Sequence, residues 1–147
     1  MIRKILIPSD GPDFSERAVE SAMELAKATG ASVVGCVVTE PYPLRMYGDL
    51  MLRGIDTVRE YNSEERLQSQ RRLAKVERAA AAAGVGYAGY AVSSHSPADA
   101  IIATAEDEGC DLICIALRDR HNFFGSYLDH ELTKVLTHTK VPVLVCH

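Results

Sequence analysis

The sequence predicts a single α/β domain built on an open, five-stranded parallel sheet with helices on both faces. Five short apolar runs alternate with segments of helical periodicity, the pattern of repeated strand–helix units. These runs are rich in Ile, Val and Leu, which is typical of strands buried on both faces. The chain has 147 residues and shows no linker or internal repeat, so one domain accounts for its length.

The first strand and helix are expected at the start of the chain. Residues 2–8 form an apolar run that ends at Pro8, as a buried strand does. Asp13 or Ser15 is expected to cap the following helix, which ends at Gly30. A second apolar strand is predicted over residues 31–38. The helix presents small and apolar residues to the sheet at helical spacing, namely Ala18, Ala22, Leu25 and Ala26.

An irregular stretch is expected over residues 41–61, where prolines and glycines alternate with Tyr, Met and Leu. A loop of this length in a small domain commonly carries function or covers another part of the molecule. A long helix is then predicted to begin at Asn62 or Ser63 and to end at Gly84.

A weaker third strand is predicted over residues 86–92. Ser96 follows as a helix N-cap, with Pro97 at the first helical position and Asp99 in the first turn. This helix is expected to turn Ile101, Ile102 and Ala105 inward and to end at Gly109. The apolar residues 111–117 predict the fourth strand, which leads into a polar loop. A helix is then expected to extend to about His138, and residues 141–146 predict the fifth strand.

Charge and hydropathy exclude several kinds of partner. The chain carries 16 Lys and Arg against 20 Asp and Glu, a net charge of −4 that argues against non-specific nucleic-acid binding. The first apolar run is too short for a signal peptide or a membrane span, so we expect a cytoplasmic protein without a membrane partner.

The four cysteines are expected to be small buried hydrophobic residues, because each lies in or beside an apolar run. Cys110 and Cys114 have neither CxxC spacing nor a histidine in ligand register. A zinc or redox role is therefore not predicted for Cys36, Cys110, Cys114 or Cys146.

Several segments together resemble the universal stress protein family, over essentially the whole chain. They are Ile5-Leu6-Ile7-Pro8-Ser9-Asp10-Gly11 with Ser15 and Ala18, Pro97-Ala98 before Ile101-Ile102, Gly109-Cys110-Asp111-Leu112-Ile113, Lys134-Val135-Leu136-Thr137-His138 and Val141-Pro142-Val143-Leu144-Val145. The resemblance implies a Rossmann-like sheet of the adenine nucleotide alpha-hydrolase-like kind. It also implies a homodimer, formed by pairing the last strand, with Val141, Val143 and Val145, with its mate.

ATP-binding members of that family share the loop G-x2-G-x9-G-[S/T] after the fourth strand. Its glycines let the backbone approach the phosphates, and its last pair places free N–H groups at a helix N-terminus. An ungapped register puts Ala116, Asp119, Asp129 and His130 at the four positions. Carboxylates there repel a triphosphate and the added Cβ atoms crowd it, so we expect no ATP binding in the family's manner.

Other residues near the expected site leave open whether a nucleotide can still bind there. The resemblance matches Asp10 to a nucleoside contact and Val38 to a position whose backbone faces adenine, although Asp10 can equally cap a turn. Asp129, or Ser126 with Asp129 in a capping box, can satisfy the helix N-terminus from within the chain. Gly125-Ser126 is a Gly-Ser pair four residues before the position at which the family has one. If it took that role, the phosphate loop would be four residues shorter than in the family.

Three further patterns have plainer explanations than catalysis or metal binding. Residues 9–14 are faintly similar to the SGGxDS pyrophosphate loop of ATP pyrophosphatases, but Asp10 replaces a glycine and Phe14 the serine. His130 and His138 lie two helical turns apart, about 12 Å, so they cannot share a metal ion. The remaining polar residues are expected to form surface ion pairs or turns and not to take part in catalysis. They are Arg118, Arg120, His121 and Ser93-Ser94-His95.

The sequence therefore predicts a homodimeric regulatory or stress-response module with no cofactor, no metal and no catalytic residue, acting through an unidentified protein partner. The alternative is an ATP- or AMP-binding switch with weak ATPase activity through a remodelled loop.

Overall fold

The sheet contains five parallel strands in the order β3-β2-β1-β4-β5 within the part of the chain that the structure covers. The structure, a computed structural model, describes residues 1–9, 14–42, 46–117 and 125–146. The strands are β1 (Lys4–Ser9), β2 (Ser32–Thr39), β3 (Tyr87–Ser93), β4 (Leu112–Ala116) and β5 (Val143–Cys146). The predicted parallel α/β sheet is confirmed, and each strand lies within two residues of its expected limits.

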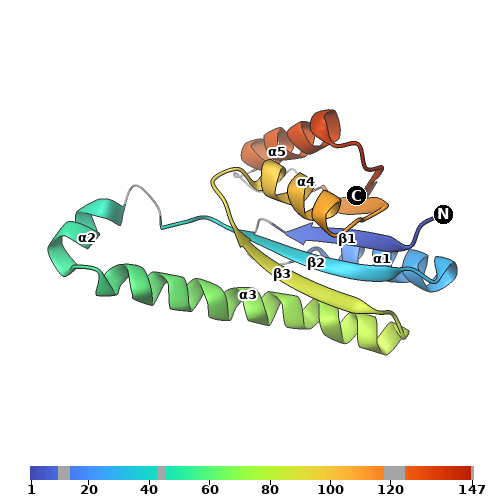
Figure 1. The fold of residues 1–147 in the computed structure, drawn as a ribbon, viewed down its shortest axis with the longest axis horizontal. Coiled ribbons are helices and arrows are strands. Elements are labelled where there is room, and N and C mark those ends of the chain that lie inside the picture. The colour runs from blue at the N-terminus through green and yellow to red at the C-terminus, as the bar shows by residue number, and fades with distance from the viewer. Residues whose placement is uncertain (10–13, 43–45, 118–124, 147) are drawn as a thin grey trace.

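Helices cover both faces of this sheet (Figure 1). One face packs against α1 (Glu16–Thr29) and α3 (Asp56–Ala83), and the other against α4 (Pro97–Asp107) and α5 (Gly125–His138). Consecutive strand residues alternate between the two faces. Ile5, Ile7 and Cys114 therefore pack on the α1 side, and Leu6, Cys36 and Ile113 on the α4 side.

The first helix follows the sequence prediction closely. The Ser15 hydroxyl accepts a hydrogen bond from the Ala18 N–H at 3.4 Å, which makes Ser15 the N-cap of α1. Gly30 ends the helix at φ 73°, a left-handed conformation that glycine adopts without steric cost. Ala18, Ala22 and Ala26 are buried, as the helical spacing predicts.

The segment 41–61 is not the irregular loop that the sequence suggested. It contains α2 (Tyr47–Arg53), and α3 begins at Asp56, not at Asn62 or Ser63. Gly54, at φ 83°, separates the two helices and donates its N–H to the Leu50 carbonyl. The prediction weighted the breaking effect of glycine above the helix propensity of the Met and Leu residues around it.

Three tyrosines connect this region to the end of β2. The Tyr42 ring lies edge-on to the rings of Tyr47 and Tyr61, with centroids 5.8 and 5.4 Å apart. The Tyr61 hydroxyl donates to the Glu40 carbonyl at 3.0 Å. These contacts tie the N-terminal part of α3 to the end of β2.

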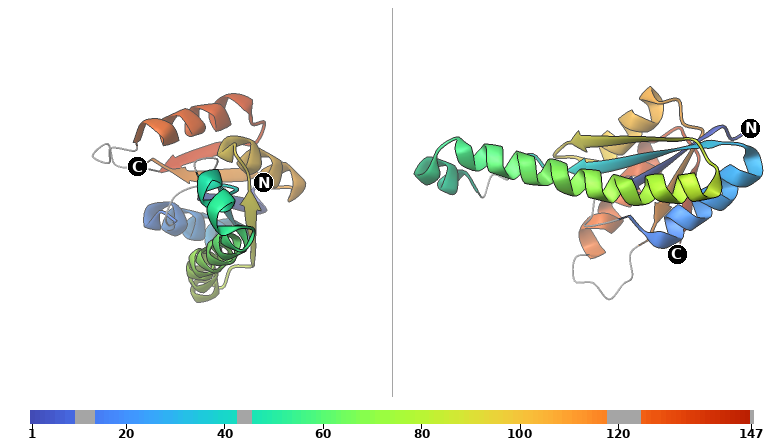
Figure 2. Two further views of the ribbon diagram at one scale, coloured as in Figure 1. Left: turned by 90° about the vertical axis from the view of Figure 1, so that its left-hand side faces the viewer. Right: turned by 90° about the horizontal axis from the view of Figure 1, so that it is seen from below.

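The C-terminal half of α3 is packed on β2 and β3, whereas its N-terminal half and α2 extend past the sheet (Figure 2). The Tyr87 hydroxyl donates to the Leu73 carbonyl at 3.2 Å, and a Cβ atom at Gly89 would clash with that hydroxyl oxygen. Glycine at position 89 thus leaves room for the Tyr87 side chain that anchors the helix. Met51 and Leu52, by contrast, are 86% and 88% exposed.

The α4 helix confirms the predicted Ser96 N-cap position and Pro97 at the start. The fifth strand begins at Val143, since Pro142 has no N–H to donate; its carbonyl accepts from the Ile113 N–H at 2.9 Å. Within the described ranges, no helix combines the length and apolar character that crossing a membrane requires.

Candidate functional site

The strand order reverses between β1 and β4, which is where ligands bind in open α/β sheets. Pairing between these two strands runs from Ile5–Leu112 to Leu6–Ile113, yet β1 continues to Ser9 and β4 to Ala116. The two strands therefore part before they end, at the carboxyl edge of the sheet.

Val38 and Ala116 lie at the carboxyl ends of β2 and β4. Among the described residues, the last pair between β1 and β2 is Ser9–Val37, and Val38 is the next residue of β2. The Val38 side chain is buried on the α4 side of the sheet, one residue before the end of β2. Ala116 ends β4 and pairs with Cys146 of β5. Asp10 and Asp119 lie outside the described residues.

Asp129 and His130 do not stand at a helix N-terminus. Helix α5 begins at Gly125, so both residues fall in its second turn, where main-chain N–H groups bond within the helix. The expectation that Asp129 caps this helix is therefore wrong, and Ser126 is a helical residue, not the N-cap. His130 is exposed.

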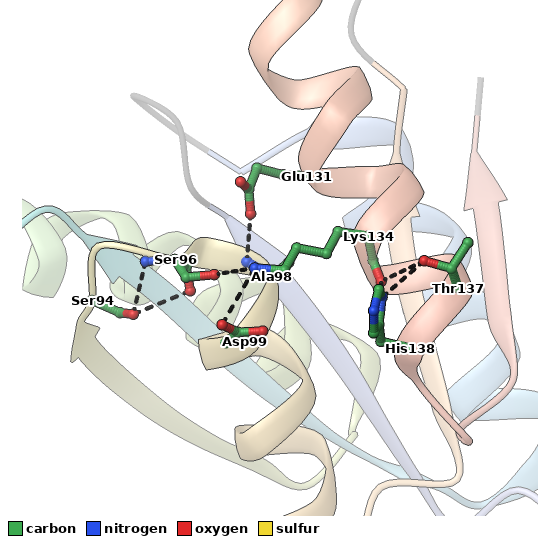
Figure 3. A network of polar contacts seen from close by, with 8 residues as sticks. All are labelled: Ser94, Ser96, Ala98, Asp99, Glu131, Lys134, Thr137 and His138. Atoms are coloured by element: carbon green, nitrogen blue, oxygen red, sulfur yellow. Dashed lines mark hydrogen bonds and ion pairs between the residues drawn. The ribbon is translucent and has the colours of Figure 1, made fainter.

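A carboxylate joins α5 to the start of α4 (Figure 3). Glu131 is only 8% exposed, and its Oε2 accepts a hydrogen bond from the Ala98 N–H at 2.8 Å. Ala98 is the second residue of α4, so Glu131 satisfies one of the free N–H groups there and places negative charge at the positive end of the helix dipole. The Ser96 hydroxyl makes no capping bond, although its position was predicted correctly.

Ser96 is instead bound by a lysine from α5, one turn beyond Glu131. Lys134 Nζ donates to Ser96 Oγ at 2.8 Å and to Asp99 Oδ2 at 3.3 Å (Figure 3). Hydrogen bonding by Ser96, together with the ammonium of Lys134, lowers the pKa of the Asp99 carboxyl below its ordinary value. Two side chains of α5 thus hold the first turn of α4.

Sequence reasoning missed Glu131, although a signal was present. Glu131 and Val135 are four residues apart on α5, and Val135 is fully buried in the core. An acidic residue on the inner stripe of a helix indicates a buried partner. The pattern does not say which partner, because that partner lies 33 residues away in sequence.

The other candidates do not assemble into a catalytic or metal site among the residues that the structure places. No group of three or more His, Cys, Asp or Glu side chains there could hold a metal ion. The Ser94 hydroxyl accepts from the Ser96 N–H and donates to the Ser96 carbonyl, both at 3.1 Å, which is the turn chemistry expected before α4. His138 Nδ1 lies 2.9 Å from the Lys134 carbonyl. Arg118, Arg120 and His121 lie outside the described residues.

Of residues 9–14, which are compared with the pyrophosphate loop, the structure describes Ser9 and Phe14. Phe14, which replaces the serine of that loop, is 7% exposed and belongs to the core cluster on the α1 side.

Comparison with known proteins supports the fold and identifies the family. The sequence profile described as "Universal stress protein family" matches residues 1–147. A Thermus aquaticus protein, "Universal stress protein in QAH/OAS sulfhydrylase 3'region", is 30% identical over 149 residues, covering 99% of this chain and 98% of its own.

Two solved structures show the same architecture. A universal stress protein family member from Burkholderia pseudomallei superposes with a TM-score of 0.71 at 22% identity, over 98% of this chain and 95% of its own. The universal stress protein from Archaeoglobus fulgidus in complex with dAMP gives a TM-score of 0.64 at 20% identity, over the full length of both chains. The whole-chain profile match and the Thermus aquaticus relative establish that this chain belongs to the universal stress protein family.

Proposed function

We propose that this chain is a homodimeric regulatory module in which the loop after β4 does not hold ATP in the manner of ATP-binding family members. The observation that carries the proposal is the position of Asp129 and His130 in the second turn of α5. An anion bound there would meet main-chain N–H groups already engaged in the helix, beside the charge of a carboxylate. The substitutions at Ala116 and Asp119 act in the same direction.

Calorimetry on the purified protein tests the proposal directly. Titration with ATP and with AMP, with and without Mg²⁺, is expected to give no binding heat. The positive control is a family member that keeps the loop G-x2-G-x9-G-[S/T], titrated under the same conditions and expected to bind ATP. A Kd tighter than about 10 μM for the unmodified chain, or nucleotide that co-purifies with it, would overturn the proposal.

A second candidate is a nucleotide-binding switch with weak ATPase activity that uses a remodelled loop. One observation favours it: α5 starts at Gly125-Ser126, so the displaced Gly-Ser pair stands at a helix N-terminus. The dAMP complex of the Archaeoglobus fulgidus relative gives this candidate a precedent at the level of the fold. Under this candidate the unmodified chain binds nucleotide, and Gly125→Pro, which removes one N–H donor, weakens binding at least tenfold.

The dimer is proposed to form through β5. This strand is an uncharged run of four residues, paired with β4 on one side, and its Leu144 is 39% exposed. A short apolar edge strand of this kind invites pairing with another strand. A cytoplasmic setting and an unidentified protein partner complete the proposal.

Light scattering coupled to size exclusion measures the assembly. The unmodified protein is expected to run at twice the chain mass of 16.0 kDa. Leu144→Lys places a charge on the β5 edge and is expected to give monomers. Leu136→Lys, at a 48% exposed position on α5, is the matched control and should leave the dimer intact. A monomeric unmodified protein contradicts the proposed interface.

A further inference from the structure

Two thiols from neighbouring strands lie in contact on the α1 side of the sheet. Cys114 Sγ of β4 and Cys146 Sγ of β5 are 3.5 Å apart, although the residues are 32 positions apart in sequence. Cys114 is fully buried, and its Sγ also lies 3.5 Å from the Ala18 carbonyl. Cys146 is only partly buried and ends β5.

The other two cysteines have different surroundings. Cys36 packs on the α4 side of the sheet, where its Sγ lies 3.8 Å from Thr104 Oγ1. Cys110 is buried in the same cluster, between α4 and β4. The contact between Cys114 and Cys146 is therefore separated by the sheet from the other thiols, which serve as internal controls.

We propose that Cys114 and Cys146 are a redox pair that a hydroperoxide oxidises to an intrachain disulfide joining β4 to β5. This assigns chemistry to residues for which the sequence spacing predicted none. It does not depend on whether the chain binds nucleotide. Nor does it compete with strand pairing across the β5 edge, since that pairing uses main-chain groups and the Cys146 thiol faces the α1 side.

The partly buried thiol reacts first. The Cys146 thiolate attacks one peroxide oxygen, the O–O bond breaks, and the products are a sulfenic acid and one hydroxide or alkoxide that takes up a proton. Cys114 Sγ, already in contact, then attacks the sulfenic sulfur; the S–S bond forms, the S–O bond breaks and water leaves. Overall two thiols give up two electrons and two protons, and one hydroperoxide is reduced to water and its alcohol, or to two waters when it is hydrogen peroxide.

Burial of Cys114 favours uncharged forms of its sulfur, the thiol and the disulfide, over the thiolate. Desolvation raises the pKa of the Cys114 thiol to about 12, so Cys114 is a poor first nucleophile and a poor thiolate ligand for a soft metal ion. A disulfide carries no charge and is compatible with the core around it. Cys146 is the less buried of the two thiols and is therefore the one that a peroxide reaches first, which leaves the resolving step to Cys114.

Disulfide formation requires the two sulfurs to approach and the backbone to move, because diagonal neighbours on paired strands have Cα atoms about 7–8 Å apart. Ala116 pairs with Cys146, so Cys114 is its diagonal neighbour, and the Sγ–Sγ distance must fall from 3.5 Å to about 2.05 Å. Cys146 is the last residue of β5, so the end of the strand can supply this movement. The bond would close a covalent loop that contains the whole of α5 and the segment after β4.

Mass spectrometry of the full chain tests the pair. The reduced protein is treated with a small excess of hydrogen peroxide, blocked with N-ethylmaleimide and weighed intact, then digested with trypsin without reduction. We expect the number of maleimide adducts obtained after unfolding to fall from four to two. We also expect a linked pair of peptides, one from residues 141–147 and one carrying Cys114, which dithiothreitol separates.

Single substitutions assign the bond. Cys146→Ser removes the linked peptide, and Cys114→Ala does the same if it folds, as judged by circular dichroism. Cys110→Ser is the decisive control because Cys110 shares a tryptic peptide with Cys114, and this variant must keep the link. Three results each overturn the proposal: four adducts after oxidation, a link that includes Cys36 or Cys110, or a link only between two chains on a non-reducing gel.

Discussion

Replacing Glu131 with alanine should destabilise the fold through a single buried contact. The change removes a charged acceptor that lies 2.8 Å from the Ala98 N–H and leaves that donor without a partner in a buried position. Hydrogen bonds to charged groups contribute about 1.5–3 kcal/mol, and the loss of negative charge at the α4 N-terminus adds about 0.3–1 kcal/mol. The variant also no longer buries a carboxylate, and this saving in desolvation free energy offsets part of the sum. We therefore expect the free energy of unfolding to fall by about 2 kcal/mol.

The conservative variant separates the hydrogen bond from the charge. Glu131→Gln keeps a carbonyl oxygen that can accept from Ala98, so its cost should be that of the charge alone, about 1 kcal/mol. Urea unfolding measures both variants, with the m value unchanged and the midpoint lowered. A loss of about 2 kcal/mol corresponds to roughly 6–8 °C in Tm for a chain of this length.

A matched control and two outcomes decide the question. Glu24→Ala replaces an exposed glutamate within α1 and should stay within about 0.5 kcal/mol of the parent protein. The reasoning fails if Glu131→Ala behaves like that control. It also fails if Glu131→Gln costs as much as Glu131→Ala, because the acceptor would then contribute nothing.

Two further predictions concern other polar groups. The Arg3 N–H donates to Asp111 Oδ2 at 2.7 Å, and this bond, with that from the Lys4 N–H, lowers the pKa of the Asp111 carboxyl. The ionised carboxyl therefore stabilises the fold at pH values above its unfolded pKa of about 3.9. This stabilisation is lost as the pH falls through the lower pKa of the folded state. In Asp111→Asn, the urea midpoint should therefore fall less steeply than in the parent protein as the pH is lowered below about 4. An unchanged dependence of the midpoint on pH would contradict this prediction. The buried Ser69 hydroxyl has no hydrogen-bond partner among the residues that the structure describes, so Ser69→Ala should raise stability by about 0.5–1.5 kcal/mol in the same assay. A loss of stability would contradict this prediction.

The strands and most helix limits could be predicted because their signals are local. Ile5-Leu6-Ile7 between a charged start and Pro8 specifies a buried strand without reference to the rest of the chain. Ser15 and Gly30 mark the ends of α1 by the chemistry of their own backbone positions. The family resemblance rests on the same local features, taken in order.

The missed features depend on contacts between distant residues. Nothing near Glu131 in sequence indicates that its carboxylate reaches Ala98, and the spacing of Cys114 and Cys146 matches no motif until β4 and β5 are placed side by side. Helix α2 was missed for a different reason, since Gly48 and Gly54 were weighted as breakers although only Gly54 ends a helix. In each case the tertiary arrangement decides what the local pattern leaves open.

The uneven anchoring of α3 has a consequence for how the chain can vary in length. Its buried residues are Ser69, Val76 and Ala80, so the 13 positions before Ser69 supply no fully buried side chain to the core. These residues span about 20 Å of helix beyond the packed part. Insertion or removal of whole helical turns there would leave the sheet and its register untouched. The core of this chain can therefore stay constant while this segment changes in length, at the cost of the contacts of Tyr61 with Glu40 and Tyr42.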